Sequence, residues 1–383
     1  MEEAAARSTS GLTHNGRAAA QLEYPFEPPA SDGSRVEIAP GIAWIRMPMP
    51  IPLDHINVYL LRDDDGWIVV DTGLHTDAAK AIWERVAAEQ LEGLPIKAVL
   101  CTHFHYDHAG LAGWLVERFD VPLYMTFGEY YMMRMTYQPL PQQPGPAQAR
   151  FLQRAGVPVE TGHAMHEALL RDPFMPKEVP AFTRLHDGQV LHIGARRWRV
   201  VVGSGHSPEH ACLYCEDEAI LISGDQLLPG ISSNVQVTPA EPEADPLQNW
   251  FDSLDRLATL APHTLVLPSH QRVFRGVHAR VQSLRDHHDG QLEQLTAFIA
   301  RQPGCTTLEA MEALFRNLRS AMDRFLALGE TIAHLSWLRF NGRVTRRLDA
   351  EGVYRFDLAD AADVARSGGG AVEQTKNMGT RCG

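Results

Sequence analysis

The sequence predicts an α/β fold in which strands and helices form a layered sandwich, followed by a smaller helical module. Between about residues 37 and 275, short apolar runs of strand length alternate with amphipathic helical patterns. These strands and helices are segregated along the chain as a layered α/β sandwich requires. At 383 residues the chain is also longer than one hydrophobic core normally organises, so we expect a main domain with a smaller companion.

The first half of the predicted sandwich begins with three strands. The segment 75–93 then follows helical periodicity with an acidic residue in its first turn, 97–103 is a buried strand, and about 110–119 is a second helix. The three strands are GIAWIRMP (41–48), HINVYLLRD (55–63) and GWIVVDTG (66–73).

The pattern changes in the segment 128–184, which carries Met, Tyr and Pro-rich pieces and which we interpret as a helical insertion. Its apolar residues could roof an acyl pocket or could simply pack the insertion on the sandwich. They are Tyr130, Tyr131, Met132, Met133, Met135, Tyr137, Phe174 and Met175. Strand patterns return at 189–194, 196–204, 210–225 and 264–270, with a helix at 245–260.

The C-terminal part is helical from about His278, and the residues around DAEG (349–352) form two short predicted strands. Helices that end in such a hairpin suggest a winged-helix-like module. We therefore divide the chain into an N-terminal tail, a main domain, this C-terminal domain and a C-terminal tail. Their bounds are 1–30, 31–277, 278–367 and 368–383. Both tails are polar and unpatterned, so we expect them to be mobile.

Composition excludes several classes of partner. The net charge of −12, from 35 Lys and Arg against 47 Asp and Glu, repels phosphate backbones and disfavours nucleic acid. Five scattered cysteines do not resemble a disulfide framework, and Cys212 and Cys215, three apart in a predicted strand, point to opposite faces. No stretch reaches the roughly 20 apolar residues of a membrane span, and residues 1–11 lack an apolar signal region. We expect a soluble cytoplasmic protein with no membrane partner.

The segment THFHYDHAG (102–110) concentrates three histidines and one aspartate within six positions. His103 and His105 lie two apart at a predicted strand end, where both side chains point to one side and can share a cation. Asp107 and His108 follow in the turn to the next helix and can face a second cation nearby. Three further candidate ligands each end an apolar run: His206, Asp225 and His270.

This set resembles the metallo-β-lactamase superfamily, whose His-x-His-x-Asp-His signature stands here at residues 103–108. The resemblance covers about residues 37–275, includes the DTG motif at 71–73, and implies an αββα sandwich with two divalent metal ions. Zinc is the expected metal, with iron or manganese as alternatives. The implied ligands are His103, His105 and His206 for one metal and Asp107, His108 and His270 for the other. Asp225 would bridge the two metals, and Asp107 would also handle protons in catalysis.

Four other residues near these motifs are weaker candidates. Single histidines usually have ordinary roles, so His55, His75 and His210, together with Asp71, are not expected to bind metal directly. Asp71 and His210 are expected instead to orient the ligands.

The resemblance implies hydrolysis by a hydroxide that bridges the metals. The carboxylate at position 225, together with Asp107 and His108, makes the chain more similar to hydroxyacylglutathione hydrolases and related thioesterases than to zinc β-lactamases with a metal-binding cysteine. We therefore expect a binuclear metal hydrolase that acts on an apolar acyl thioester or related ester, with a small-molecule acyl substrate. A lactonase, a β-lactamase-like hydrolase, and a nuclease that uses the winged helix to bind nucleic acid are the alternatives.

The C-terminal module carries arginines at 343, 346 and 347, but nearby acidic residues balance them. A surface that follows phosphates normally shows a basic excess. We expect this module to serve packing or homodimerisation rather than nucleic-acid binding.

Overall fold

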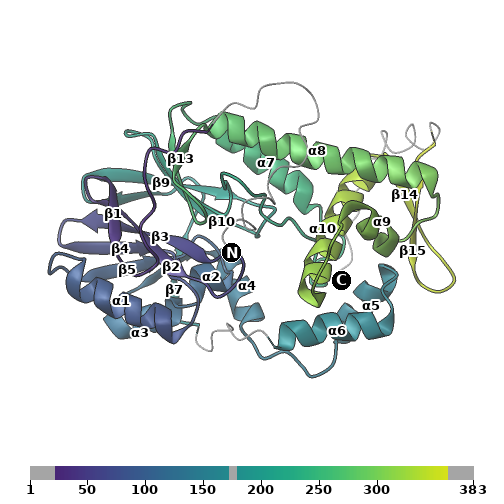
Figure 1. Cartoon of the computed structure of the whole chain (residues 1–383), viewed down its shortest axis with the longest axis horizontal. Helices are drawn as coiled ribbons and strands as arrows, with labels where there is room; N and C mark the ends of the chain where they lie inside the picture. Colours follow the sequence, from purple (N-terminus) through teal and green to yellow (C-terminus); the bar gives the residue numbers. More distant parts are fainter. Residues whose placement is uncertain (1–21, 172–178, 361–383) are drawn as a thin grey trace, which may run out of the picture.

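The computed structural model of the chain describes residues 22–171 and 179–360. Two β-sheets face each other, and helices cover both outer faces, so the predicted αββα sandwich is confirmed (Figure 1). The first sheet has seven strands in sequence order, antiparallel up to β4 and parallel from β4 to β7. They are β1 (Arg35–Ala39), β2 (Ile42–Pro48), β3 (His55–Asp63), β4 (Gly66–Val70), β5 (Ile96–Leu100), β6 (Leu123–Thr126) and β7 (Phe182–Leu185).

The second sheet has six strands in the order β13-β12-β11-β10-β9-β8. Only β11 and β12 run parallel in it, and α7 (Pro246–Ala258) makes the crossover between them. The strands are β8 (Val190–Ile193), β9 (Arg196–Gly203), β10 (His210–Cys215), β11 (Ile220–Gly224), β12 (Leu265–Pro268) and β13 (Phe274–Arg275).

Central strands are apolar on both faces because each sheet is covered on both sides. In β2, Ile42 and Trp44 join the core between the sheets, whereas Ile45 and Met47 face the outer helices. Trp44 lies directly opposite Tyr59 of β3 in the register and both are fully buried. Successive strand residues point to opposite faces, so burial of both faces produces nearly continuous apolar runs.

The outer helices complete the layers. The helices α1 (Asp77–Glu89) and α3 (Ala112–Phe119) pack on the first sheet, and α7 and α8 (Val277–Arg301) pack on the second. In the second sheet Cys212 faces α7 and α8, while Cys215 faces the core between the sheets. The predicted opposite orientation of these two cysteines is therefore confirmed.

The C-terminal part consists of α8, α9 (Thr307–Leu314), α10 (Ala321–Phe340) and the antiparallel hairpin β14 (Val344–Leu348) and β15 (Tyr354–Leu358). Capping boxes at Thr306 with Glu309 and at Ser320 with Asp323 fix the starts of α9 and α10. The order of helices and then a hairpin around DAEG is as the sequence predicts.

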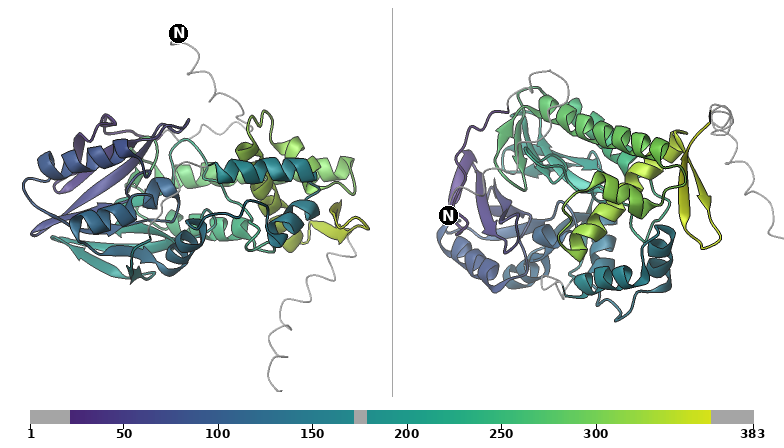
Figure 2. Two further views of the ribbon diagram at one scale, coloured as in Figure 1. Left: turned by 90° about the horizontal axis from the view of Figure 1, so that it is seen from below. Right: turned by 45° about the vertical axis from the view of Figure 1, so that its right-hand side comes forward.

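The segment predicted as an insertion contains α4 (Phe127–Thr136), α5 (Pro146–Arg154) and α6 (Val159–Leu170). The helix α4 stays beside the sandwich, whereas α6 packs against α10 of the C-terminal part (Figure 2). This segment therefore connects the sandwich to the C-terminal helices.

Three details differ from the sequence-based expectation. The strands β1 and β13 were not predicted, and β7 begins inside the predicted insertion. Residues 22–30 fall within the predicted tail, yet the backbone of Glu23 pairs with that of Arg275 in β13. Phe174, Met175 and the outer parts of both predicted tails lie outside the described residues. In the described ranges, no helix is long and apolar enough to cross a membrane.

Candidate metal centre

Four loops at one edge of the sandwich bring the seven predicted ligands together. The β5 strand leads into His103 and His105, and the short helix α2 (Tyr106–Ala109) follows with Asp107 and His108. His206 lies in the loop between β9 and β10. Asp225 directly follows β11, and His270 lies two residues beyond β12; these two strands are parallel, so their carboxyl ends meet at the same edge.

One donor group consists of His103, His105 and His206. His103 Nε2 lies 2.8 Å from His105 Nδ1 and 3.3 Å from His206 Nε2. The three donor atoms all lie within 4.8 Å of one another. Such spacing places three nitrogen lone pairs around one point, as a shared cation requires.

The second donor group consists of Asp107, His108 and His270. Asp107 Oδ2 lies 3.3 Å from His270 Nε2 and 3.5 Å from His108 Nε2. Asp225 reaches both groups, because its Oδ2 lies 3.4 Å from His206 Nε2 and its Oδ1 lies 3.5 Å from His108 Nε2. This carboxylate therefore occupies the position between the two groups.

The donor atoms fit divalent metal ions. His108 Nε2 and Asp225 Oδ1 are buried without a hydrogen-bond partner among the described residues, although both point into the group. Uncompensated buried polar atoms are costly, and a cation between them would satisfy both. Imidazole and carboxylate donors without thiolate suit zinc, iron or manganese. These clusters could hold metal.

The charges of the buried carboxylates also favour a cation between the two donor groups. Burial opposes protonation of His108, but the carboxylates of Asp107, Asp225 and Asp71 outweigh it and raise the pKa of this histidine. Burial would raise the pKa of Asp107, yet the neighbouring histidines lower it to about 2. Burial would likewise raise the pKa of Asp225, and the neighbouring histidines again lower it, so Asp107 and Asp225 stay ionised, and bound cations can supply the charge that they attract.

A set of partners holds the ligands from behind. Asp71 follows β4 in a left-handed conformation with φ 61°, and its Oδ2 lies 2.8 Å from His108 Nδ1. Asp71 also accepts hydrogen bonds from the backbone and hydroxyl of Thr102. His210 Nε2 accepts a hydrogen bond of 3.1 Å from the backbone N–H of Asp225. The contacts of Asp71 and His210 are those expected of residues that orient ligands.

Two further contacts of this kind come from backbone oxygens. His270 Nδ1 donates to the carbonyl of His55 at 2.9 Å, and His206 Nδ1 donates to the carbonyl of Asn234 at 2.8 Å. Each contact leaves Nε2 facing the centre of the site. A carbonyl partner is not visible in a sequence, because any residue could provide it.

Glu129 of α4 is a site residue that sequence reasoning missed. Its carboxylate is fully buried and accepts hydrogen bonds from Phe104 N (3.0 Å), Ser207 Oγ (2.7 Å) and Glu209 N (2.7 Å). Burial raises the pKa of Glu129 to about 7, although these hydrogen bonds favour its charged form. The side chain joins the loop of His103 and His105 to the loop of His206. A single Glu in a Met- and Tyr-rich helix gives no sequence signal for this role.

The apolar residues of α4 divide between core and surface. Tyr130, Met133 and Tyr137 are buried in the core outside the first sheet, so for them the packing interpretation is right. Tyr131 and Met135 are each 51% exposed. The exposed pair, with the partly buried Met132, can contact a ligand.

The sandwich and its cluster of histidines and aspartates define the class of the protein. Residues 51–270 match the metallo-beta-lactamase superfamily, and residues 292–359 match a family described as metallo-beta-lactamase-like, C-terminal domain. The chain belongs to the metallo-beta-lactamase superfamily and is a metallo-hydrolase of that group.

Individual relatives agree with this assignment. A solved beta-lactamase domain protein from Burkholderia ambifaria is 41% identical, with a TM-score of 0.81, and the match covers 88% of this chain and 98% of that one. A probable metallo-hydrolase of Bacillus subtilis is 30% identical over 81% of this chain and 96% of its own length. A human acyl-coenzyme A thioesterase is 27% identical over 61% of this chain and 79% of its own length.

Proposed function

We propose that the protein hydrolyses acyl thioesters at a binuclear metal centre held by His103, His105, His206, Asp107, His108, His270 and Asp225. The observation that carries the proposal is the position of the Asp225 carboxylate between two groups of three donors. Seven donors exceed the four that one zinc ion takes, which supports two ions. The similarity to a human thioesterase supports the thioester as the bond that is broken.

The chain's own residues then position the reactants. When bound, two divalent cations would lower the pKa of water and polarise the substrate carbonyl. The side chain of Asp107 is 18% exposed and that of Asp225 is 10% exposed, so Asp107 is the carboxylate that substrate can reach more easily. We assign to Asp107 the transfer of the proton from water to the departing thiolate. The water oxygen joins the carbonyl carbon, and the C–S bond breaks.

The acyl group would lie against α4. Tyr131 and Met135 present apolar surface on this helix, and Tyr137, directly after its last residue, donates a hydrogen bond to the carbonyl of Phe104 in the ligand loop. The helix is thereby fixed to the metal loop. A flexible, Met-containing surface adapts to acyl chains of different length.

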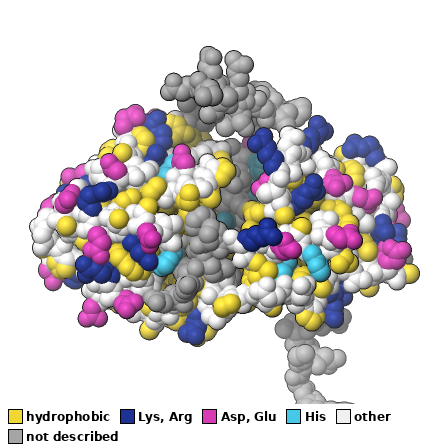
Figure 3. Space-filling view, turned by 60° about the horizontal axis from the view of Figure 1, so that its bottom comes forward, with side chains coloured by type: hydrophobic (Ala, Val, Ile, Leu, Met, Phe, Trp, Pro, Cys, Tyr) yellow, Lys and Arg dark blue, Asp and Glu magenta, His cyan; other side chains and the backbone are white. Residues whose placement is uncertain are grey.

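The surface of the protein is less suited to nucleic acid than to a small acyl substrate. Basic and acidic side chains are interspersed on the face shown in Figure 3 and form no continuous basic patch there. In the C-terminal part, Arg346 is paired with Glu243 and Arg355 with Asp349. We propose that the C-terminal helices and hairpin, as a winged-helix-like element, serve packing and substrate binding rather than nucleic-acid binding.

A substrate panel combined with metal analysis tests the proposal. Acyl thioesters, lactones, a β-lactam and RNA are assayed on protein whose metal content has been measured, with Asp225→Asn as the control for contaminating activity. We expect about two transition-metal ions per chain and a kcat/KM for thioesters at least about tenfold above the other substrates. Preferred turnover of lactone, β-lactam or RNA by the two-ion protein would overturn the substrate assignment.

A further inference from the structure

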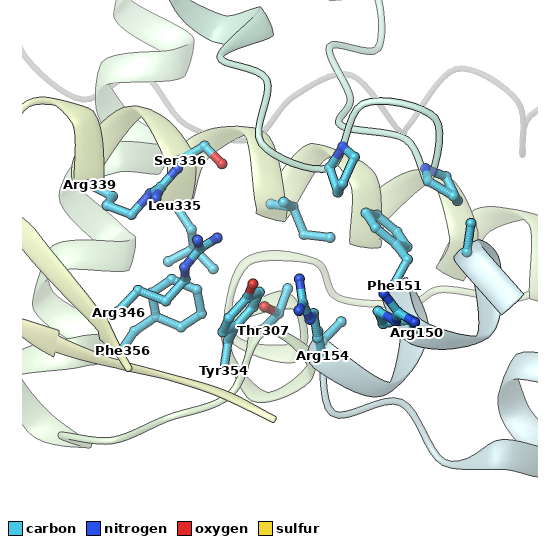
Figure 4. A pocket seen from close by; sticks show the side chains of 15 residues that line it. Arg150, Phe151, Arg154, Thr307, Leu335, Ser336, Arg339, Arg346, Tyr354 and Phe356 are labelled. Atoms are coloured by element: carbon cyan, nitrogen blue, oxygen red, sulfur yellow. The ribbon is translucent and has the colours of Figure 1, made fainter. Parts of the chain in front are cut away.

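A second pocket lies away from the metal centre, between α5, α10 and the C-terminal hairpin (Figure 4). Its cavity has a volume of about 190 Å³. Pockets that enclose whole drug-sized ligands usually measure roughly 300–1,000 Å³, so this one would hold one end of a longer molecule. Phe151, Leu335 and Phe356 provide apolar parts of its wall.

Arginines dominate the polar part of this pocket. Arg150, Arg154, Arg339 and Arg346 line it, and its lining residues include no Asp or Glu. Glu243 pairs with Arg339 at 3.0 Å and with Arg346 at 2.8 Å. Asp245 also interacts electrostatically with Arg339, so four guanidinium groups stand against two carboxylates, which leaves two positive charges in excess on a chain whose net charge is −12.

The pocket also contains an aromatic ring, against which two of its arginines lie. The guanidinium carbons of Arg154 and Arg346 lie 5.2 Å and 4.0 Å from the centre of the Tyr354 ring. Guanidinium groups bind phosphate oxygens in pairs, and aromatic and guanidinium planes stack on flat rings. The combination suits a ligand with phosphate groups and a flat heterocycle.

One chain segment connects the metal centre to this pocket. The carbonyl of Asn234 holds His206, and the backbone N–H of Val237 then donates to the carbonyl of Gly329 in α10. Farther along the same segment, Pro239 and Pro242 line the pocket. The contact with α10 is close, because a Cβ on Gly329 would lie 3.0 Å from the carbonyl oxygen of Val237.

The helix α10 shows how far the pocket lies from the segment behind His206. Asn234 Nδ2 donates to Glu330 of α10 at 3.0 Å, and the pocket is lined by residues 332–339 of the same helix. At 1.5 Å per residue, these lining residues lie about 3–14 Å beyond Glu330 along the helix axis. A ligand held at both places needs a long, thin connecting arm.

We propose that the arginine pocket binds the phosphate-bearing end of the thiol carrier whose thioester is hydrolysed at the metal centre. The carrier class is one in which the thiol stands at the end of a long arm and the other end bears phosphates and a heterocycle, as in coenzyme A. This inference rests on the proposed thioesterase function, because that function places the thioester end of the carrier at the metal centre. Binding of the carrier to the pocket can nevertheless be tested without any assay of hydrolysis.

The test uses the metal-loaded full chain. It compares a variant that removes positive charges from the pocket with a control variant that removes the same number of positive charges elsewhere. Arg150→Gln/Arg154→Gln removes two pocket charges, and Arg301→Gln/Arg316→Gln removes two exposed charges elsewhere. The single variant Arg150→Gln, at an exposed position, repeats the test without disturbing the Tyr354 contact. Binding of coenzyme A, of pantetheine without phosphates and of ATP is measured by calorimetry, together with KM for matched acyl thioesters of the first two carriers.

We expect wild-type protein to bind coenzyme A at least about tenfold more tightly than pantetheine or ATP, because only coenzyme A supplies both the arm and the phosphates. The pocket variant should lose at least about tenfold in affinity for coenzyme A and gain a similar factor in KM, with little change in kcat. The control variant should bind coenzyme A as wild type does. The KM for the pantetheine thioester should be the same in the pocket variant and in wild type.

Equal binding of coenzyme A and pantetheine, or unchanged coenzyme A affinity in the pocket variants, would overturn the proposal. ATP binding as tight as that of coenzyme A would assign the pocket to free nucleotides and would overturn it as well. If coenzyme A binding depends on the arginines but no thioester is hydrolysed, the pocket assignment holds and the proposed function fails. If thioesters are hydrolysed with no dependence on the arginines, the pocket assignment fails and the proposed function holds.

Discussion

Replacing Glu330 by Gln should stabilise the protein at neutral pH. The carboxylate lies between α10 and the segment behind His206, and it accepts hydrogen bonds from Asn234 Nδ2 and Gln291 Nε2. Burial raises its pKa to about 7, against an ordinary value of 4.5. The Oδ1 of Asn234 and the Oε1 of Gln291 are buried without a partner among the described residues, so the amide of Glu330→Gln gains acceptors that an ionised carboxylate cannot use.

The magnitude follows from linkage between protonation and folding. The pKa is raised in the folded state, so the contribution of Glu330 is fully present below pH 4.5 and is lost as the pH rises to about 7. At about 1.4 kcal/mol per pH unit, the loss reaches at most about 3 kcal/mol above pH 7. Glu330→Gln does not titrate, so its advantage over wild type should grow between pH 4.5 and 7 and then stay constant.

Urea denaturation at several pH values between 5 and 8 measures this difference. Other titrating groups cancel when the variant is compared with wild type at each pH. Glu312→Gln, at an exposed position of α9, is the matched control for the same change of side chain outside this contact. A variant that is less stable than wild type at pH 8, or a difference that does not change with pH, would refute the reasoning.

Four further predictions concern the metal centre, the core and the acyl site. Asp107→Asn should lower kcat by about 100-fold or more while part of the metal remains, because both a ligand charge and the proposed proton carrier are lost; an unchanged kcat would remove Asp107 from the mechanism. Asp71→Asn should weaken metal affinity by about 10–100-fold in a chelator competition, since the carboxylate that holds His108 Nδ1 becomes an amide; equal affinity would mean that His108 needs no such partner. Met133→Ala should lower the free energy of unfolding by about 2–5 kcal/mol without altering the preference for acyl chain length, because Met133 is fully buried in the core. Tyr131→Ala/Met135→Ala should instead flatten the chain-length profile of kcat/KM, and a profile that only Met133→Ala changes would move the acyl site elsewhere.

The strands that are buried on both faces were predictable because their composition is nearly all apolar, as in β2 and β3. The strands β1 and β7, which differ from expectation, have weaker patterns, and β13 has only two residues. β1 is partly exposed with a single buried residue, Ile38, and β7 is a short edge strand with only Leu185 buried. Edge strands gain their order from pairing with a neighbour, and a local sequence pattern does not contain that information.

The ligands of the candidate site could be predicted because imidazoles and carboxylates follow apolar runs, and the structure brings all seven together. The residues that hold them could be predicted only in part. Asp71 stands in a recognisable motif, whereas Asn234 acts through its backbone carbonyl and Glu129 through a carboxylate buried by tertiary packing. The arginine pocket combines residues from α5, α10 and the hairpin, which only the folded chain brings together.

The donor atoms of the candidate metal centre come from loops of both sheets, so ions bound there would cross-link the folded chain. His103 follows a strand of the first sheet, and His206, 103 positions later in the sequence, lies between strands of the second. Ions bound there would close long loops that an unfolded chain leaves open, so they bind the folded state almost exclusively. Metal supply would then affect the stability of the fold as well as its activity, and a chelator would remove one of the links between the two sheets, whose apolar core would remain.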